Sequence, residues 1–374
     1  MSHISLIRLT NFRNLYDQEI KFSKSANVFI GKNGGGKTNL LESISLLSPG
    51  RGLKKEILTK ITKFKIKNPW VVFLKYDQED KTTFDIATTY DISKSESVIK
   101  KILINGIKQK KSLELDSLPN LIWFIPEMER LFGGPPSLRR NFIDRIVYSF
   151  DKKILFELNS YSKLIRERYQ IIQMDNIDEN WLDKVEESIV ILGISIIRKR
   201  DKILRILNET FKIDLIPMKI SGCQIKMTGY IDELFSNNNQ NIKEKYLDEI
   251  RKSRINDRFR GGCGIGPHKS DLEILYLKNN IYANYCSTGQ QKEIILNMLL
   301  CQSYCLIKAH KKKPILIFDE VCSHLDENTR SIILYLIEWL KVQVFMTGND
   351  EKLFSFLSKK AKFFSVKSGS INSL

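Results

Sequence analysis

The stretch that most constrains this chain is the octapeptide GKNGGGKT at residues 31–38. An apolar run, NVFI at 27–30, comes directly before it, and a segment with a helical apolar stripe at 40–47 follows it. A strand, a glycine-rich loop and a helix start in this order let backbone N–H groups surround phosphate oxygens. A glycine-rich turn without a ligand is the alternative. Because the strand, the lysine and the threonine are all in register, the sequence favours a phosphate-binding loop.

The residues of this loop have separate predicted roles. Three glycines at 34–36 let the backbone approach the phosphates closely. Lys37 is expected to reach the outer two phosphates, and the Thr38 hydroxyl is expected to bind Mg²⁺. The predicted nucleotide-binding residues of this segment are Gly31, Lys32, Asn33, Gly34, Gly35, Gly36, Lys37, Thr38 and Asn39.

A second segment, PILIFDE at 314–320, supplies two carboxylates. Four apolar residues followed by Asp319 and Glu320 are typical of a central parallel strand that presents acids at its C-terminal edge. Asp319 is predicted to hold Mg²⁺ through water, and Glu320 to polarise the attacking water. Carboxylates often do no more than end a strand, but the phosphate loop favours the chemical interpretation. Lys37, Asp319 and Glu320 are therefore the predicted catalytic residues.

A third segment, STGQQKEIILNMLL from residue 287, has the features of a helix start. Ser287 and Thr288 are favourable N-cap residues, Gly289 permits close backbone approach, and an apolar helix follows. A helix N-terminus attracts anions. Since the phosphate loop lies far upstream in the sequence, this segment predicts a second phosphate contact.

The predicted secondary structure changes twice along the chain. Strand-like alternation dominates the first hundred or so residues, and a hairpin is expected around Asn105 and Gly106. Long helical stretches occupy about 127–253, and strand and glycine signals then return. This order favours an α/β fold in which a phosphate-loop head with mixed β-sheets is interrupted by an inserted helical arm. The predicted domains are 1–122 for the N-terminal part of the head, 123–258 for the arm, and 259–374 for the C-terminal part.

The charge of the chain points to a polyanionic partner. With 60 Lys and Arg against 43 Asp and Glu, the formal net charge is +17, which favours nucleic acid or an acidic membrane surface. Solvated lysine faces are an equally open explanation. Sequence-independent contacts to DNA phosphates are predicted for basic clusters on or beside the arm, at Arg139, Arg140, Arg198, Lys199, Arg200, Arg251 and Arg254.

No targeting or membrane-spanning segment is expected. The longest apolar run, at 189–197, is about half the length of a membrane span, and the N-terminus lacks the apolar core of a signal peptide. The six cysteines form no C-x-x-C pair and have no histidines at zinc spacing. We therefore expect a cytoplasmic protein with reduced thiols and no membrane partner.

The phosphate loop, the acidic strand and STGQQK together resemble the ATP-binding-cassette class of ATPases. In that class a serine-glycine-glutamine signature caps the γ-phosphate of ATP held by the opposite subunit. The resemblance implies that Ser287, Gly289 and Gln290 act in trans across a two-fold interface, with Asp326 near the other subunit's phosphate loop. ATP and Mg²⁺ would then induce a homodimer.

Further segments narrow the resemblance. LIRLTNFRNL, FIPEMERLFGGPPSLRRNFIDR, GIGPHKSDLEI and QVFMTG stand in the order found in the RecF family of bacterial recombination and repair ATPases, which are similar to SMC heads. This implies slow DNA-dependent ATP hydrolysis, and a clamp on double-stranded, single-stranded or gapped DNA that helps RecR and RecO load RecA in replication, repair and the SOS response. Arg13 and Asn14, after the first strand, are expected to meet the nucleotide.

Two departures qualify these expectations. Met128 stands where the RecF family usually has aspartate. Thr347, Gly348 and Asn349 stand where ordinary cassette ATPases place a histidine; the RecF family also lacks it, and slow turnover is consistent with its loss. Two alternatives stay open, namely the nucleotide-binding subunit of a membrane transporter and a phosphate-loop kinase of a small molecule.

Overall fold

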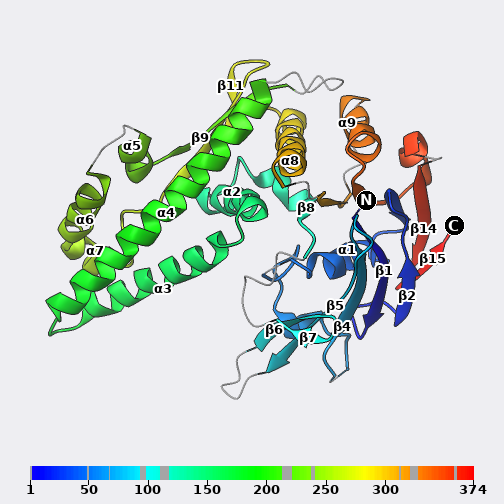
Figure 1. The fold of residues 1–374 in the computed structure, drawn as a ribbon, viewed down its shortest axis with the longest axis horizontal. Helices are drawn as coiled ribbons and strands as arrows, with labels where there is room; N and C mark the ends of the chain where they lie inside the picture. Colours follow the sequence, from blue (N-terminus) through cyan, green and yellow to red (C-terminus); the bar gives the residue numbers. More distant parts are fainter. Residues whose placement is uncertain are drawn as a thin grey trace. The chain divides into compact units, whose positions relative to one another are not determined.

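The chain divides into two compact units (Figure 1). Unit 1 comprises Met1–Glu129, Ile216–Met218 and Ile295–Leu374, and unit 2 comprises Arg130–Leu215 and Lys219–Ile294. The structure is a computed structural model, and it describes residues 2–48, 50–66, 68–92, 98–109, 118–212, 221–236, 241–310, 313–320, 327–357 and 360–374.

The first sheet of unit 1 is almost entirely parallel. Its order is β15-β14-β3-β13-β12-β8, and each neighbouring pair is parallel except β14 and β15. The strands are β3 (Ala26–Ile30), β8 (Leu121–Phe124), β12 (Ile315–Phe318), β13 (Gln343–Gly348), β14 (Ala361–Lys367) and β15 (Ser370–Ser373). Every residue of β8, β12 and β13 is buried, as expected for parallel strands covered on both faces. The predicted central parallel strand is confirmed, because β12 pairs in parallel with both β8 and β13.

The second sheet of unit 1 is antiparallel, in the order β2-β1-β4-β5-β6-β7. Its strands are β1 (His3–Thr10), β2 (Gln18–Lys21), β4 (Val71–Asp77), β5 (Thr83–Ile92), β6 (Val98–Ile104) and β7 (Ile107–Lys108). Asn105 and Gly106, with φ of 50° and 79°, form the predicted hairpin turn between β6 and β7. The strand-rich start predicted for the chain is confirmed.

Both ends of the chain build unit 1. In Figure 1 the blue N-terminal strands and the red C-terminal strands lie side by side, and β3 pairs with both β13 and β14. Phenylalanines from both ends pack together, since the rings of Phe29 and Phe364 are 4.9 Å apart and those of Phe22 and Phe345 are also 4.9 Å apart. The helices are α1 (Lys37–Ser45) and α9 (Glu327–Glu338), with 3-10 turns η1 (Leu58–Ile61) and η6 (Glu351–Leu357). The predicted α/β head interrupted by a helical insertion is confirmed.

Unit 2 is mainly helical. Its helices are α2 (Pro136–Phe150), α3 (Ile154–Gln173), α4 (Glu179–Lys212), α5 (Tyr230–Ser236), α6 (Ile242–Lys252) and α7 (Arg254–Arg260). A small antiparallel sheet, in the order β11-β10-β9, contains β9 (Cys223–Thr228), β10 (Asp271–Tyr276) and β11 (Ile281–Tyr282), followed by the turn η4 (Ala283–Tyr285). Two elements cross the unit boundary, the turn η3 (Pro126–Arg130) and helix α8 (Thr288–His310).

One strand of unit 2 was missed by the sequence analysis, which assigned helix to the whole stretch around it. Strand β9 alternates buried Cys223 and Ile225 with exposed neighbours, and Ile225 pairs with Ile274 of β10. Its pairing partner lies far along the chain, so local periodicity did not reveal it.

The compact units and the predicted domains follow different criteria. The predicted division at 122 and 258 follows sequence texture, whereas the units follow contacts, and residues 259–294 fall in unit 2 because β10 pairs with β9. The domain boundaries stay a prediction. Within the described residues, every helix is too short or too polar to cross a bilayer.

Candidate nucleotide site

The phosphate loop lies between β3 and α1, as predicted. Gly36 caps α1 with φ of 115°, a conformation that residues with a side chain rarely adopt. A Cβ atom at Gly31 would lie 2.1 Å from the carbonyl oxygen of Val366 in β14, so only glycine fits there. The first turn of α1, all of it described, contains no acidic residue and has no side-chain cap. Its N–H groups therefore form a favourable anion site.

The ammonium group of Lys37 lies inside this loop. Lys37 Nζ donates to the carbonyl oxygens of Gly31 (2.5 Å) and Lys32 (3.2 Å) and to Asn349 Oδ1 (2.8 Å). Burial lowers the pKa of Lys37 below its ordinary value, while the charges of Glu320 and Asp319 act in the opposite direction. The side chain is thus pre-positioned at the loop beside both predicted catalytic carboxylates.

Asp319 joins the loop to the neighbouring strand. Its Oδ1 accepts hydrogen bonds from Thr38 Oγ1 (3.2 Å) and Thr347 Oγ1 (2.6 Å). Burial raises the pKa of Asp319 above its ordinary value, and these two hydrogen bonds oppose the shift. Thr38 and Asp319, the predicted metal ligands, are therefore in direct contact although 281 residues separate them in the sequence.

Glu320 has an unusual backbone conformation. Its φ is 51°, which is uncommon for a residue with a side chain, and its N–H donates to Thr347 Oγ1 (2.9 Å). Residues held in such conformations cluster at functional sites, where the surrounding structure maintains them. Thr347 maintains this one, since its hydroxyl contacts both Asp319 and Glu320.

Thr347 and Asn349 were not predicted as functional residues. In the sequence their segment is distinguished only by its missing histidine. β13 pairs in parallel with β12, so residues at the C-terminal end of β13 lie beside Asp319 and Glu320. The signal that could have found them is this shared edge, which becomes visible only once the strand order is known.

Arg13 and Asn14 lie beside the loop, but they behave differently. The Arg13 guanidinium donates to both carboxylate oxygens of buried Glu42 (2.6 and 2.7 Å), so an internal ion pair occupies it. Asn14 donates to the Gly34 carbonyl (3.1 Å) and accepts from Asn39 Nδ2 (2.7 Å). Of the two, Asn14 is the side chain that directly organises the loop.

A cavity of about 640 Å³ adjoins these asparagines in unit 1. Two aromatic side chains, Tyr16 and Phe64, line it together with Lys60 and Lys63, and both aromatics are exposed. Lys63 Nζ lies 5.1 Å from the centre of the Tyr16 ring. An open cavity with aromatic faces and cations suits a planar heterocycle that carries negative charge nearby.

The predicted signature residues lie at the start of α8, in unit 2. The Ser287 N–H donates to Gln290 Oε1 (2.9 Å), and the Gln290 N–H donates to Ser287 Oγ (3.4 Å), which is the reciprocal arrangement of a capping box. Ser287 and Gly289 are exposed, and the space around Gly289 is open. Asp326, and His324 beside it, lie outside the described residues.

Two predicted DNA contacts are held inside unit 2. Arg200, only 2% exposed, donates to both oxygens of Asp144 (2.7 and 2.9 Å) and to the Pro267 carbonyl (2.8 Å). Arg139 donates to both oxygens of Asp271 (2.7 and 2.8 Å). Because internal bonds occupy these guanidinium groups, the predicted role of Arg139 and Arg200 as DNA contacts is not supported.

The remaining predicted DNA contacts of unit 2 are partly engaged. Arg140 donates to the Ser270 carbonyl, and Lys199 pairs with Asp151 and Glu157. Arg251 pairs with Asp183, and Arg254 pairs with Glu179, Asp183 and Glu186. Arg198 on α4 is exposed. Exposed cations of this unit can still attract a polyanion, but charge density alone overstated their number.

Comparison with known proteins agrees with this geometry. A family model described as RecF/RecN/SMC N terminal domain matches residues 3–372. A DNA replication and repair protein RecF from Rhizobium rhizogenes is 32% identical over 369 residues, covering 98% of each chain. The chain belongs to the RecF family. A RecF protein from Agrobacterium fabrum is also 32% identical, over 370 residues and 98% of each chain.

Solved structures give the same answer. A structure of the recombination mediator protein RecF-ATPrS in the RecFOR pathway has a TM-score of 0.87 and 26% identity, covering 100% of this chain and 98% of the other. An SMC head domain from Pyrococcus furiosus, at 16% identity and a TM-score of 0.53, shares the fold. The RecF resemblance is thereby confirmed, and it displaces the transporter-subunit and small-molecule-kinase alternatives.

Proposed function

We propose that this RecF-family chain is a slow ATPase that acts as a DNA clamp. Two copies of the chain close on DNA when ATP is bound. One observation carries the proposal: Thr38, Asp319, Thr347 and Glu320 form one hydrogen-bonded group at the phosphate loop. Phosphate-binding ATPases use a hydroxyl, a metal-binding carboxylate and a water-polarising carboxylate in this arrangement.

The loop residues fit ATP and Mg²⁺ chemically. The uncapped first turn of α1 offers N–H groups to phosphates, and Lys37 supplies a positive charge beside them. Thr38 and Asp319 are the residues that would hold Mg²⁺, an ion that commonly takes one or two carboxylates and keeps several waters. Held by these two residues, the ion would supply positive charge against the negative charge that develops on the phosphates. We further infer that the base lies in the cavity between Tyr16 and Phe64.

Glu320 is the residue placed to orient and polarise a water. The positive φ of Glu320 and the hydrogen bond from its N–H to Thr347 fix the backbone from which the carboxylate side chain projects, directly after β12. Asn349 occupies the segment that carries a histidine in cassette ATPases, and it accepts a hydrogen bond from Lys37. Since a neutral amide cannot exchange a proton at this position, slow turnover is expected.

The exposed start of α8 supports a site shared between two copies. Ser287 and Gly289 are exposed in unit 2, and Ser287 exchanges two hydrogen bonds with Gln290. An exposed helix N-terminus can bind the outer phosphate of a nucleotide held by a second molecule. In this proposal Asp326 lies at the same interface, and ATP stabilises the homodimer.

Changing Ser287 to Arg should abolish ATP-dependent dimer formation, because a bulky cation replaces the cap and blocks the approach of a second copy. Sedimentation velocity with and without ATP measures the dimer. At low protein concentration the wild-type ATPase rate should rise with the square of concentration. Ser188→Arg, at an exposed serine of α4, is the matched control and should dimerise normally. A Ser287→Arg variant that still dimerises with ATP would contradict the shared site.

The surface that favours DNA most clearly in unit 1 is the segment between α1 and β4. Its sequence holds Arg51, Lys54, Lys55, Lys60, Lys63, Lys65 and Lys67 against the single acid Glu56. Arg51, Lys55 and Lys65 are exposed, and Lys65 lies beside the exposed ring of Phe64. A dense, exposed group of cations supports sequence-independent phosphate contacts.

Replacing Arg51, Lys55 and Lys65 together by alanine should weaken binding to duplex DNA and flatten its salt dependence. Each lost phosphate contact lowers the slope of log K against log salt by about 0.9, so a decrease of roughly two to three is expected. Fluorescence anisotropy at several salt concentrations measures it. Arg198→Ala with Lys202→Ala, at exposed positions of α4, is the comparison. If only the α4 variant changes the slope, DNA binds unit 2 instead.

The biological setting is also proposed from the family. RecF relatives are named for DNA replication and repair, and the similar solved structures are assigned to the RecFOR pathway. We infer that this chain works in the cytoplasm on gapped DNA, with RecR and RecO, to help RecA load during recombinational repair and the SOS response. The preferred DNA structure can be tested by comparing gapped, single-stranded and plain duplex fragments as activators of ATP hydrolysis.

A further inference from the structure

Helix α7 (Arg254–Arg260) in unit 2 has an inverted distribution of polarity. Two of its charged residues, Arg254 and Asp257, point into the unit, and Asp257 is only 4% exposed. Its large apolar residues point outward, since Ile255 is 72% exposed and Phe259 is 84% exposed. Ile255 and Phe259 are four residues apart, so they lie on the same face of the helix.

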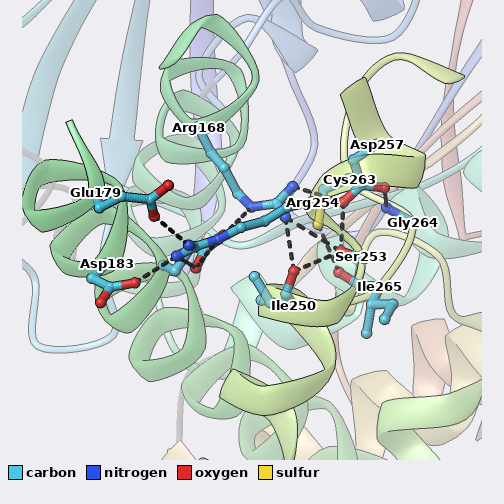
Figure 2. A network of polar contacts seen from close by, with 11 residues as sticks. Arg168, Glu179, Asp183, Ile250, Ser253, Arg254, Asp257, Cys263, Gly264 and Ile265 are labelled. Atoms are coloured by element: carbon cyan, nitrogen blue, oxygen red, sulfur yellow. Dashed lines mark hydrogen bonds and ion pairs between the residues drawn. The ribbon is translucent and has the colours of Figure 1, made fainter. Parts of the chain in front are cut away.

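Arg254 anchors one end of α7 to helix α4. Figure 2 shows its guanidinium reaching Glu179 and Asp183. The same guanidinium also donates to Glu186. The bonds to Glu179 Oε2 and Glu186 Oε2 are both 2.6 Å long. Three carboxylates on one helix thus fix the position of a single side chain of α7.

Asp257 anchors the next turn. Its Oδ2 accepts from Arg168 of α3 (2.7 Å) and from Ser253 Oγ (2.6 Å), and its Oδ1 accepts from the Gly264 N–H (2.8 Å), as Figure 2 shows. Arg168 is fully buried and also donates to fully buried Glu186 (2.8 Å). The two anchors of α7 therefore belong to one continuous ionic network.

This network determines which face of α7 is exposed. Burying a charged group costs free energy of desolvation, and ion pairing often does no more than offset that cost. Apolar residues of similar volume can frequently replace a buried ion pair without lowering the stability of the fold. The hydrophobic effect alone would turn Ile255 and Phe259 inward. Since Arg254 and Asp257 are bonded on the opposite face, the helix is held with its apolar side in solvent.

The exposed face also has a defined charge. Arg258 and Arg260 are exposed beside Phe259, whereas Asp257, the single acidic residue of α7, is buried. Aromatic and arginine side chains are the residues most enriched at the energetic centres of protein interfaces. An aliphatic and an aromatic anchor at i and i+4 is the pattern by which a helix enters an apolar groove.

We propose that the outer face of α7, defined by Ile255, Arg258, Phe259 and Arg260, docks a partner protein that offers an apolar pocket rimmed by carboxylates. Charge complementarity to the two arginines selects the carboxylate rim. A nucleic acid could also contact the arginines through its phosphates and stack a base on Phe259, but these contacts do not involve the exposed aliphatic side chain of Ile255. The observations therefore favour a protein, and DNA is kept as an outcome of the test.

The test compares an apolar variant with a charge variant. The apolar variant, Ile255→Ser with Phe259→Ser, removes the two apolar anchors. The charge variant, Arg258→Glu with Arg260→Glu, reverses the charge of the two arginines. Ile191→Ser, at an exposed position of α4, is the matched control. The probes are purified RecR and RecO of the same organism, a choice that rests on the proposed function. Sedimentation velocity measures binding, and circular dichroism verifies the helical content of each variant.

Wild-type protein is expected to bind at least one probe. The apolar variant should weaken that binding at least tenfold, the charge variant should weaken it and reduce its salt dependence, and Ile191→Ser should change neither. Failure of wild type to bind either probe, or unchanged binding by the apolar variant, overturns the proposal. A loss of DNA affinity without a loss of probe binding assigns the face to nucleic acid and also overturns it. ATP-dependent dimerisation is measured in parallel, so failure of the clamp is distinguished from failure of the docking face.

Discussion

Replacing Glu320 by glutamine is expected to lower the rate of ATP hydrolysis by about 10²–10⁴-fold, the usual contribution of a positioned general base. The amide keeps the size of the side chain, and the backbone bond from Glu320 N–H to Thr347 does not involve the changed group. ATP should therefore still bind. The ATP-dependent dimer should persist, because ATP hydrolysis no longer causes its dissociation. Phosphate release measures the rate, and sedimentation with ATP measures the dimer.

Lys37→Ala is the matched comparison for this experiment. Lys37 contacts the loop carbonyls and Asn349, so its loss should weaken nucleotide binding itself and remove the dimer as well as the hydrolysis. The two variants thus separate binding from chemistry. If Glu320→Gln hydrolyses ATP at the wild-type rate, another group polarises the water and the proposed role of Glu320 is wrong.

Replacing Arg168 by alanine is expected to destabilise the protein by about 3–5 kcal/mol, the usual cost of breaking a buried ion pair. The change leaves Glu186 without one of its cations and Asp257 without its bond to α3, while Glu186 remains fully buried. It also removes the donor to the Ile250 carbonyl. Denaturant unfolding followed by circular dichroism measures the loss.

Arg205→Ala on α4 is the control for this substitution. Arg205 is 72% exposed and pairs with Asp201 one turn away, so its removal should cost less than about 0.5 kcal/mol. A similar small loss for Arg168→Ala would show that the buried network contributes little to the free energy of unfolding. The network would then also fail to explain the orientation of α7.

Local sequence was informative wherever the chemistry is carried by consecutive residues. GKNGGGKT predicted the strand, the loop and the helix, because backbone N–H groups of neighbouring residues make the phosphate site. Asn105 and Gly106 likewise predicted their hairpin, because both adopt positive φ. Pairing between distant segments was less accessible, and β9 was missed because β10 follows it only after three helices.

The basic residues illustrate the other limit. Sequence composition counted Arg200 and Arg139 as candidates for DNA, yet both are bonded to carboxylates of unit 2. Thr347 and Asn349 carried no recognisable motif, yet they contact Asp319, Glu320 and Lys37. A charge or a hydroxyl acquires its role from what surrounds it, and the surroundings come from distant parts of the chain.

The sequence by itself determined the phosphate loop and the two carboxylates after β12, because each depends on residues that are adjacent in the chain. It also determined the family, because short motifs stand in a characteristic order along the chain. Only the tertiary structure decided which cations are free to meet a phosphate, which hydroxyl joins Asp319 to Glu320, and which face of α7 meets solvent. These depend on burial and on partners supplied by other elements. Neither burial nor the identity of these partners can be read from a local sequence pattern. An arginine can be a solvent-exposed cation or a buried member of an ion pair, depending on its neighbours in space.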